Sequence, residues 1–325
     1  MRAITQKTYG GPDSLVPAEI PRPVPRKGEV LIRVRASSVN AADWLLMHGE
    51  PYLVRLMFGI RGPRVTTRGR DVAGVVEALG PHTSGFEVGD SVYAEVDAGS
   101  FADYTVAPIK RLAHMPSNLS FEQAAAVPIA ATTALQGLRD VGKVKPGDRV
   151  LINGASGGVG SFAVQIASAL GAHVTAVCSS RNLDSARSWG AEHVIDYTTT
   201  DFTTLDVRYD VIFDIAGNHS LKEMERSLTA KGTLVLASGS GGKLLGPVAR
   251  ILAASIRGMF ASPSLKPLAS SSNRADLAVL RDLIEANQVT PAIERTYSLE
   301  DVPAALTHFG IEHARGKIVI SVHDE

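Results

Sequence analysis

A glycine-rich segment in the second half of the chain has the residue types and the spacing of a phosphate-binding turn. The apolar run Val150–Ile152 precedes Ala155–Gly160, which has alanine where the first glycine of G-x-G-x-x-G is usual, and apolar residues at helical spacing follow. Glycines let the backbone approach a pyrophosphate, and a helix N-terminus favours its negative charge. The segment predicts a dinucleotide site; an ordinary Gly-rich turn is the alternative. The predicted contacts are Ala155, Ser156, Gly157, Gly158 and Val159.

The segment after the next predicted strand, Cys178–Asn182, indicates which dinucleotide is bound. In dinucleotide-binding folds an acidic residue about 20 residues after the glycine turn binds the ribose 2′-OH of NAD. This segment has no acid, but it has the hydroxyls of Ser179 and Ser180 and the guanidinium of Arg181, which can bond a 2′-phosphate. It therefore predicts NADPH (or NADP⁺) in preference to NADH. The alternative is that Arg181 only begins a solvated helix.

Strands and helices are predicted to alternate around this turn. Continuous apolar runs such as Val211–Ile215 indicate a parallel sheet that is covered on both faces. An Ala-rich helical stretch, Phe121–Val141, precedes the sheet and must bend or restart at Pro128. The predicted strands are Val150–Asn153, His173–Cys178, His193–Asp196, Val211–Ile215 and Thr233–Ser238. The predicted helices are Gly158–Leu170, Arg181–Trp189, His219–Leu228, Lys243–Ile256 and Arg274–Ala286.

The first 120 residues have the short, alternating pattern of an antiparallel, barrel-like domain. Glu29–Arg35 alternates apolar and charged residues, so one face of that strand is wet. Glycine, proline and aspartate separate this run from similar ones. The last predicted strand, Gly316–Val322, alternates again, and we expect it to rejoin the sheet of the first domain.

The composition excludes several classes of protein. Lys+Arg and Asp+Glu both number 33, and this zero net charge argues against binding of nucleic acid or an anionic membrane, but it is compatible with self-association. The most apolar window, Leu244–Phe260, is interrupted by Pro247, Arg250 and Arg257, so no membrane span is predicted. The single cysteine, Cys178, allows no internal disulfide and reads as a small core hydrophobe. A cytoplasmic protein is expected.

Taken together, these motifs resemble the medium-chain dehydrogenase/reductase superfamily, in its zinc-free quinone oxidoreductase branch. The resemblance covers nearly the whole chain and implies an α/β fold with two domains. These are a GroES-like β-barrel domain, residues 1–122 and 263–325, and a Rossmann domain with a doubly wound parallel sheet, residues 123–262. It also implies a homodimer formed through edge strands near Gly258–Ser262. The motifs that carry it are Ile20–Ile32, Ser38–Asp43, Gly69–Val76, Phe86–Tyr93, Gly154–Gly160, Asp196–Tyr197 and Ala314–Val319.

The resemblance also indicates that this chain binds no zinc. Zinc-bearing relatives would have cysteine at the position of Asn40, histidine at that of Arg70 and a third ligand near Ile129. A catalytic zinc needs three ligands of the Cys, His or carboxylate type, and an amide, a guanidinium and an aliphatic side chain cannot hold it. The four-cysteine structural lobe is missing as well, and the nine histidines are scattered.

Without a Lewis acid, hydride must go to an acceptor that is electrophilic by itself, such as a quinone or the β-carbon of an enone or enal. The oxyanion or enolate that develops still benefits from a hydrogen-bond donor. The amide of Asn40, at the vacated metal position, is the first candidate, and Tyr52 could donate a bond or a proton. The alternatives are that Asn40 is a turn residue bonding its own backbone and that Tyr52 only lines the entrance.

The resemblance implies further coenzyme contacts. Thr133 and Asn40 are expected near the nicotinamide end, and Tyr197 is expected at the 2′-phosphate. Lys317 is a candidate by family position, although a lysine entering a terminal strand is often just solvated. Asn182 departs from the family, where a lysine is common nearby. Ala216, Gly217, Ser238 and Gly239, at the carboxyl ends of successive strands, should flank the ribose and nicotinamide.

The leading hypothesis is an NADPH-dependent reductase of small hydrophobic quinones, enones or enals. The apolar segment Met47–Ile60 is either a mobile wall for such a substrate or plain core. An enoyl-thioester reductase is a second hypothesis, and a non-catalytic NADPH-binding structural or sensor protein is a third.

Overall fold

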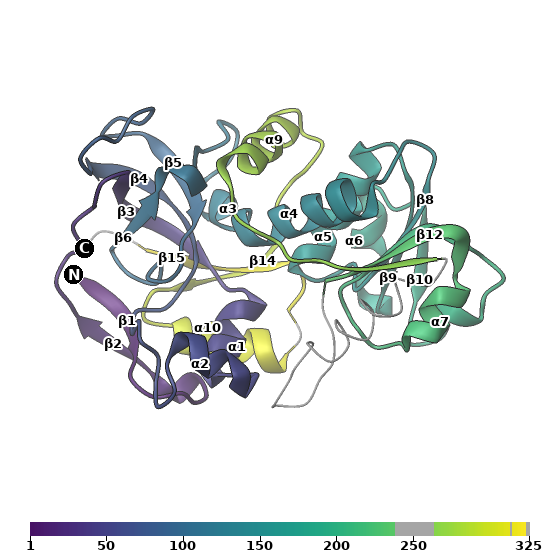
Figure 1. Ribbon diagram of the computed structural model, residues 1–325, viewed down its shortest axis with the longest axis horizontal. Helices are drawn as coiled ribbons and strands as arrows, with labels where there is room; N and C mark the ends of the chain where they lie inside the picture. Colours follow the sequence, from purple (N-terminus) through teal and green to yellow (C-terminus); the bar gives the residue numbers. More distant parts are fainter. Residues whose placement is uncertain (238–262, 313, 323–325) are drawn as a thin grey trace. The chain divides into compact units, whose positions relative to one another are not determined.

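The computed structural model describes residues 1–237, 263–312 and 314–322 (Figure 1). The chain divides into two compact units. The first consists of residues 1–132, 272–287 and 291–325, and the second of residues 133–271 and 288–290. The resemblance implies domain limits at 122/123 and 262/263, and these limits stay a prediction. The helix α3 (Phe121–Ala125) spans the predicted limit at 122/123. It contacts β3, β4 and β15 of the first unit.

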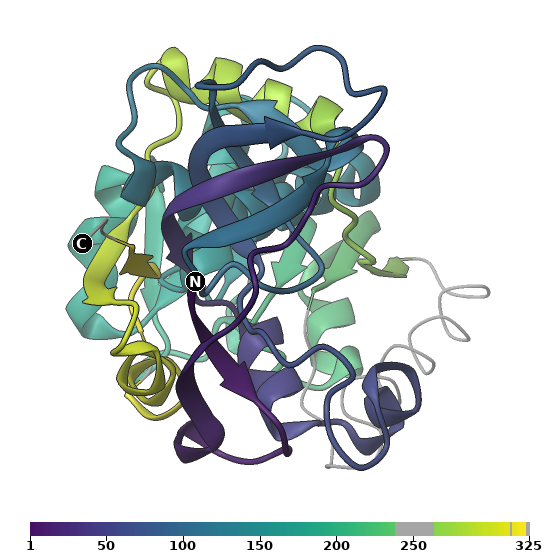
Figure 2. The ribbon, with the colours of Figure 1, turned by 90° about the vertical axis from the view of Figure 1, so that its left-hand side faces the viewer.

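The first unit is built on a seven-stranded sheet in which β3 (Glu29–Ser38) has a central place. This strand pairs antiparallel with β15, β4 and β6. Its Val30, Ile32 and Val34 are buried, as the alternation predicts. The other strands of the unit are β1 (Arg2–Gln6), β2 (Leu15–Glu19), β4 (Asp71–Leu79), β5 (Ser91–Glu95), β6 (Tyr104–Pro108), β7 (Leu112–His114), β14 (Ile293–Ser298) and β15 (Lys317–Ser321). Strands β1 and β2 form a separate antiparallel ribbon near the N-terminus (Figure 2).

The C-terminal strand joins this sheet, which confirms the prediction. β15 pairs with β3, with Val319 opposite Ser38. Its other neighbour, β14, is parallel to it, so the sheet is not wholly antiparallel. The helix α10 (Val302–Ile311) connects these two strands, as a crossover between parallel neighbours requires. The entry of β15 into the sheet interior, between β14 and β3, decides the environment of its first residue, Lys317.

Short helices cover the first unit. The helix α1 (Ala41–His48) follows β3 directly, and the Asn40 N–H donates to the carboxylate of Asp43 at 2.9 Å. At α9 (Arg274–Glu285) the side chain of Asn273 accepts from the backbone N–H of Asp276. The remaining helices are α2 (Arg55–Phe58) and three 3₁₀ turns, η1 (Pro12–Ser14), η2 (Tyr52–Val54) and η3 (Ile109–Arg111).

The second unit is a six-stranded parallel sheet in the order β10-β9-β8-β11-β12-β13. The strand order reverses between β8 and β11, which is the switch point where doubly wound sheets bind ligands. The predicted parallel sheet is therefore confirmed. Its strands are β8 (Arg149–Asn153), β9 (His173–Cys178), β10 (His193–Asp196), β11 (Tyr209–Asp214), β12 (Leu228–Leu236) and β13 (Ser264–Pro267). Its helices are α5 (Gly158–Ala169), α6 (Leu183–Ser188) and α7 (Leu221–Arg226), with the 3₁₀ turns η5 (Ser180–Asn182) and η6 (Phe202–Thr204).

The Ala-rich stretch before this sheet is interrupted where proline predicts it. The helix α3 ends at Ala125, and α4 (Pro128–Leu135) begins at Pro128, whose missing N–H is harmless in a first turn. A π-helical stretch, η4 (Gln136–Gly142), continues from it. The predicted helix Lys243–Ile256 and the predicted dimer segment Gly258–Ser262 lie outside the described residues.

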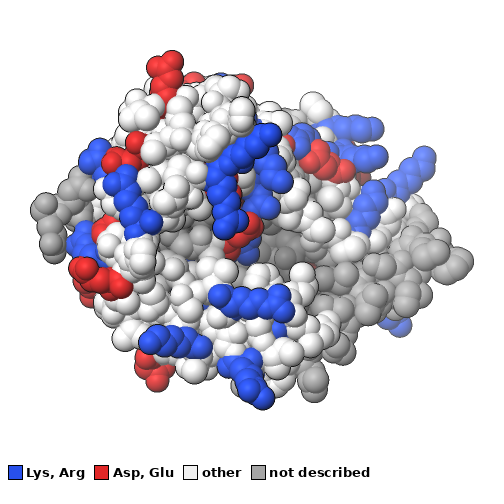
Figure 3. All heavy atoms as spheres, turned by 60° about the vertical axis from the view of Figure 1, so that its left-hand side comes forward, with Lys and Arg blue, Asp and Glu red and all other residues white. Residues whose placement is uncertain are grey.

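Burial and charge agree with the sequence in several respects. Cys178 is fully buried, and burial raises the pKa of its thiol to about 11, so it remains protonated as a small hydrophobe. Side chains of both charge signs occur across the face drawn in Figure 3. Among the described residues, no helix is both long enough and apolar enough to cross a bilayer.

Candidate functional site

The glycine turn of the second unit is tight for steric reasons. Gly154, directly after β8, has a φ of +92°, which favours glycine. A Cβ on Gly160 would lie 2.1 Å from the carbonyl oxygen of Gly154, so no side chain fits there. A Cβ on Gly157 would meet nothing nearer than 3.7 Å. The chain itself therefore does not need glycine at 157, and the free space in front of the α5 N-terminus suits a phosphate.

Polar side chains organise the edge of the sheet beside this turn. The Asn153 amide donates to the carboxylate of Asp214 and to the side-chain oxygen of Asn218, both at 2.8 Å. Asp214 is completely buried and also accepts from the N–H of Gly217 at 3.0 Å. The Ala216 N–H donates to the Asn153 carbonyl at 3.2 Å. The structure thus brings the predicted residues Ala216 and Gly217 to the glycine turn, through two polar residues that the sequence analysis missed.

The predicted phosphate-binding residues lie at the carboxyl ends of β9 and β10, where Cys178 is opposite Asp196. Arg181 and Tyr197 are exposed, and Ser179 is half-buried. The Asn182 amide donates to the Ser179 hydroxyl oxygen at 3.1 Å, which leaves the hydroxyl proton of Ser179 for another acceptor. Three donors able to contact a phosphate therefore stand at one edge of the sheet.

Ser180 lies beside Asp196 and Thr198 at the same edge of the sheet. Hydrogen bonds from Thr198, and then from Ser180, lower the pKa of the Asp196 carboxyl. The Thr198 hydroxyl and N–H donate to Asp196 at 2.7 and 2.9 Å. The Ser180 hydroxyl lies 3.5 Å from that of Thr198, which links the loops after β9 and β10. Its contact with a 2′-phosphate stays a prediction. Asp196 was given no role from the sequence, although it lies in the Asp196–Tyr197 motif that carries the family resemblance.

In the first unit, Asn40 belongs to a buried polar network that joins three strands. The Asp71 carboxylate, at the start of β4, accepts from the Asn40 amide nitrogen at 2.9 Å, the Ser38 hydroxyl at 2.8 Å and the Ile129 N–H at 3.0 Å. Lys317, at the start of β15, donates to the Asn40 side-chain oxygen at 2.6 Å. Its ammonium lies 3.6 Å from the Asp71 carboxylate. Asp71 is 0% and Lys317 2% exposed.

This network excludes the view of Lys317 as a solvated strand residue. Its third donor reaches the Val39 carbonyl at 3.1 Å, so the ammonium is surrounded by protein acceptors. Burial lowers its pKa, while the charges of Asp71 and Asp43 act in the opposite direction. Lys317 is therefore a buried hydrogen-bond partner of Asn40. Asp71 was missed by the sequence analysis, although an acid beginning an otherwise apolar strand was a usable signal.

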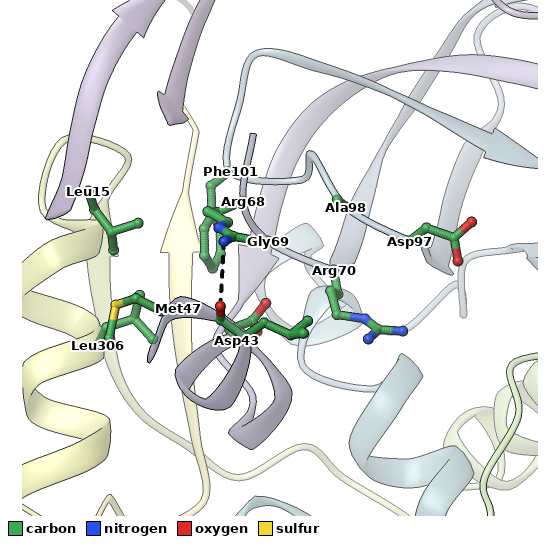
Figure 4. A pocket seen from close by; sticks show the side chains of 11 residues that line it. Leu15, Asp43, Met47, Arg68, Gly69, Arg70, Asp97, Ala98, Phe101 and Leu306 are labelled. Atoms are coloured by element: carbon green, nitrogen blue, oxygen red, sulfur yellow. Dashed lines mark hydrogen bonds between the residues drawn. The ribbon is translucent and has the colours of Figure 1, made fainter. Parts of the chain in front are cut away.

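Asp43 is a second buried carboxyl close to this network. Burial raises its pKa to about 7, the charge of Asp71 adds to the rise, and Arg70 opposes it. Asp43 also lines a small cavity with Arg68, and its carboxylate points toward Arg68 and Gly69 (Figure 4). Near neutral pH the protonation of this one group therefore changes the charge around Asn40.

The residues at the positions of a family zinc site do not fit the metal. The Asn40 amide is bonded to Asp71 and Lys317, and the Arg70 guanidinium is paired with Glu95 at 2.6 Å. Ile129 offers a backbone N–H, which is a donor. Within the described part of the chain, no group of three His, Cys, Asp or Glu side chains could hold a metal ion.

The segment 47–60 is mostly exposed, so it is not plain core. Met47 is buried, but the large apolar side chains after it face solvent. Tyr52 is 44% exposed, and the Arg55 guanidinium lies 4.5 Å from its ring centre. Thr133 is half-buried in α4, and the predicted contacts Ser238 and Gly239 lie outside the described residues. The exposed apolar residues are Leu53, Leu56, Met57, Phe58 and Ile60.

Comparison with known proteins identifies the family. Residues 26–117 match the alcohol dehydrogenase GroES-like domain, and residues 189–320 match the zinc-binding dehydrogenase family. The chain is 32% identical over 335 residues to a chloroplastic quinone-oxidoreductase, QR1, of Triphysaria versicolor, covering 98% of both proteins. The chain belongs to the medium-chain dehydrogenase/reductase superfamily. As a member it is an NAD(P)H-dependent oxidoreductase, and both the predicted family and the predicted GroES-like plus Rossmann fold are confirmed.

Two further members of the superfamily are similar over most of the chain. An NADPH-dependent alkenal/one oxidoreductase, chloroplastic, of Arabidopsis thaliana is 31% identical, over 98% of this chain and 79% of the relative. The solved structure of the quinone oxidoreductase from Coxiella burnetii superposes with a TM-score of 0.86 at 28% identity, covering 99% of each chain.

Two alanine substitutions separate the steric and the ligand-binding roles of the glycine turn. Gly160→Ala forces a Cβ against the Gly154 carbonyl, so we expect a loss of about 3 kcal/mol of unfolding free energy in urea. Gly157→Ala has room within the chain, so its stability should match the wild type. Its coenzyme affinity should fall at least roughly tenfold, because the methyl group fills the space in front of the helix. Unchanged affinity of Gly157→Ala would rule out this turn as the phosphate site.

Asp43 makes stability depend on pH. Its pKa is about 7 in the folded protein and 3.8 when unperturbed, so the stability it contributes is fully present below 3.8 and is lost as the pH rises through 7. Asp43→Asn never ionises and keeps an acceptor for the Asn40 N–H. Its unfolding free energy relative to wild type should therefore rise between about pH 4 and pH 8, by up to about 4 kcal/mol. Asp13→Asn, at an exposed aspartate, is the control, and parallel pH curves for Asp43→Asn and wild type would contradict the prediction.

Proposed function

We propose that this protein reduces quinones or α,β-unsaturated carbonyl compounds by hydride transfer from NADPH, without a metal. The observation that carries the proposal is the buried network of Asn40, Asp71 and Lys317, which stands where the zinc-binding relatives would place a ligand. An amide held between a lysine and a carboxylate cannot polarise an alcohol or a simple carbonyl as a Lewis acid does. The acceptor must then be electrophilic by itself.

The preference for NADPH rests on the ends of β9 and β10. Ser179, Arg181 and Tyr197 can donate to a 2′-phosphate, and no acid stands at the end of β9 to repel it. The glycine turn and the N-terminus of α5 suit the pyrophosphate. The bound dinucleotide would supply the hydride, while the chain binds and orients it. The Arabidopsis relative is named as an NADPH-dependent enzyme as well.

For Asn40 the hydrogen bonds favour a different contact from the predicted oxyanion donor. Its amide hydrogens are directed at Asp71 and, at 3.3 Å, at the Ser38 carbonyl. The remaining capacity is on the side-chain oxygen, which can accept from the carboxamide N–H₂ of a nicotinamide. Thr133, Ala216 and Gly217 stay predicted contacts of the same end of the coenzyme. Tyr52 remains a candidate donor to the substrate, and the exposed apolar side chains from Leu53 to Ile60 suit a hydrophobic acceptor.

The homodimer and the cytoplasmic location stay predictions. The zero net charge and the single buried cysteine are compatible with both.

Steady-state consumption of NADPH across a panel of acceptors tests the proposed reaction. We expect turnover with para-quinones, ortho-quinones and enals, and none with saturated ketones, because these need a Lewis acid. Added zinc and added chelator should leave the rates unchanged. Activity confined to enoyl thioesters would favour the enoyl-thioester reductase, and coenzyme binding without any turnover would favour a non-catalytic role.

Replacement of Arg181 tests the coenzyme preference. Arg181→Ala removes a charge-assisted bond to the 2′-phosphate, so the KM for NADPH should rise roughly tenfold or more. The KM for NADH should change less than twofold, because that coenzyme has no phosphate to lose. Arg187→Ala is the matched control, since this arginine of α6 is paired with Asp184. Equal effects of Arg181→Ala on both coenzymes would contradict the assignment.

A further inference from the structure

The Asn40 network fixes the direction of an amide. Lysine has only donors and an ionised carboxylate has only acceptors, so the Asn40 oxygen must face Lys317 and its nitrogen must face Asp71. A reversed amide would oppose donor to donor and acceptor to acceptor, and both charge-assisted bonds would be lost. The two charges therefore hold one orientation of a neutral side chain.

The partners of the amide are themselves held in place. Asp71 accepts from the Ser38 hydroxyl and from the Ile129 N–H in addition to Asn40. Lys317 is anchored to the Val39 carbonyl at 3.1 Å. All of these groups belong to the first unit, where Ser38, Asp71 and Lys317 lie in strands β3, β4 and β15.

A buried ion pair is a costly way to stabilise a fold. Taking two charges out of water offsets most of their attraction, and well-packed apolar residues of the same size are often as stable or more so. Asp71 and Lys317 have exposures of 0% and 2%, so both bear this desolvation. A role in orientation accounts for the pair better than a contribution to stability.

We propose that Asp71 and Lys317 are positioning residues, which hold the Asn40 carboxamide so that the second lone pair of its carbonyl oxygen, beside the one that Lys317 uses, is left to recognise a hydrogen-bond donor. The inference rests on the proposed function and names that donor as the carboxamide N–H₂ of the nicotinamide. Lys317 and Asp71 act through Asn40 and do not touch the coenzyme. The pair therefore controls how the coenzyme is held and leaves the stabilisation of the acceptor oxyanion to other groups.

Coenzyme analogues test the donor directly, by equilibrium binding without any acceptor. The 3-acetylpyridine analogue of NADP⁺ replaces the amide N–H₂ with a methyl group, whereas the thionicotinamide analogue keeps it. Wild-type protein should bind the acetylpyridine analogue roughly tenfold more weakly than NADP⁺, as expected for one lost hydrogen bond. Asn40→Ala should bind NADP⁺ and the acetylpyridine analogue equally, because it has no side-chain oxygen to accept from the amide N–H₂. Equal binding by the wild type would overturn the inference, whereas failure to bind any of these coenzymes would overturn the proposed function itself.

A mutant cycle tests the positioning role. Asp71→Leu with Lys317→Met removes both charges together, so neither is left unpaired. Because the Ser38 hydroxyl and the Ile129 N–H lose their acceptor, the melting temperature should fall, but by less than in Asp71→Leu alone. The double variant should nevertheless lose the discrimination against the acetylpyridine analogue and raise the KM for NADPH roughly tenfold. Adding Asn40→Ala to it should cause no further loss, because the pair acts through Asn40.

The control is a second ion pair of the same unit, Arg2 and Asp103, at 3.0 Å. Arg2→Met with Asp103→Leu should leave the analogue discrimination unchanged. Independent, multiplying effects of Asn40→Ala and of the Asp71/Lys317 double variant would show that the pair has only a structural role, and would overturn the inference. If the double variant fails to fold, Lys317→Arg, which keeps the charge, and Lys317→Met supply the comparison. The inference then requires that only Lys317→Met loses the discrimination.

Discussion

In the first unit, a buried carboxylate and a buried ammonium lie together. Asp71 and Lys317 are far apart in the chain, and each would be prohibitively costly to bury alone. They meet because β4 and β15 both pair with β3, with Asp71 opposite Ser38 and Val319 opposite the same residue on the other side. A slip of one residue in either pairing would turn these side chains to the other face, so the charges and the strand register specify each other.

The second unit depends on a constraint of a different kind, the close approach of backbone to backbone. Gly160 must be glycine because the Gly154 carbonyl fills the space of a side chain, and this packing brings α5 against the switch point of the sheet. Two carboxylates, those of Asp214 and Asp196, then hold the loops at the carboxyl edge of this sheet. Asp214 fixes the loop after β11, and Asp196 ties the loops after β9 and β10, so that Arg181 and Tyr197 are presented together. The proposed coenzyme preference thus depends on acids that need not touch the coenzyme.

The proposed chemistry follows from the residue at the position where the resemblance places a metal ligand in zinc-bearing relatives. In this medium-chain dehydrogenase/reductase that residue is Asn40, a neutral amide held between two opposite charges. A fixed amide can orient a coenzyme, but it cannot acidify an alcohol, and this is why we propose quinones and unsaturated carbonyls as acceptors. Asp43, with a pKa of about 7, adds a charge that varies with pH close to the same amide.

The sequence by itself determined the strand–glycine–helix unit, the parallel sheet after it, the return of the last strand to the first sheet and the missing acid after Cys178. These depend on local periodicity, on steric limits at glycine and proline, and on residue types at fixed spacing. Only the tertiary structure decided that Lys317 is buried, that the Asn40 oxygen faces Lys317 and that the Ser180 hydroxyl lies beside that of Thr198. It also decided that the side chains of Leu53, Leu56, Met57, Phe58 and Ile60 are exposed. Each of these depends on partners from other strands, such as the bond between Lys317 and Asn40 across 277 residues, and no local pattern carries that information.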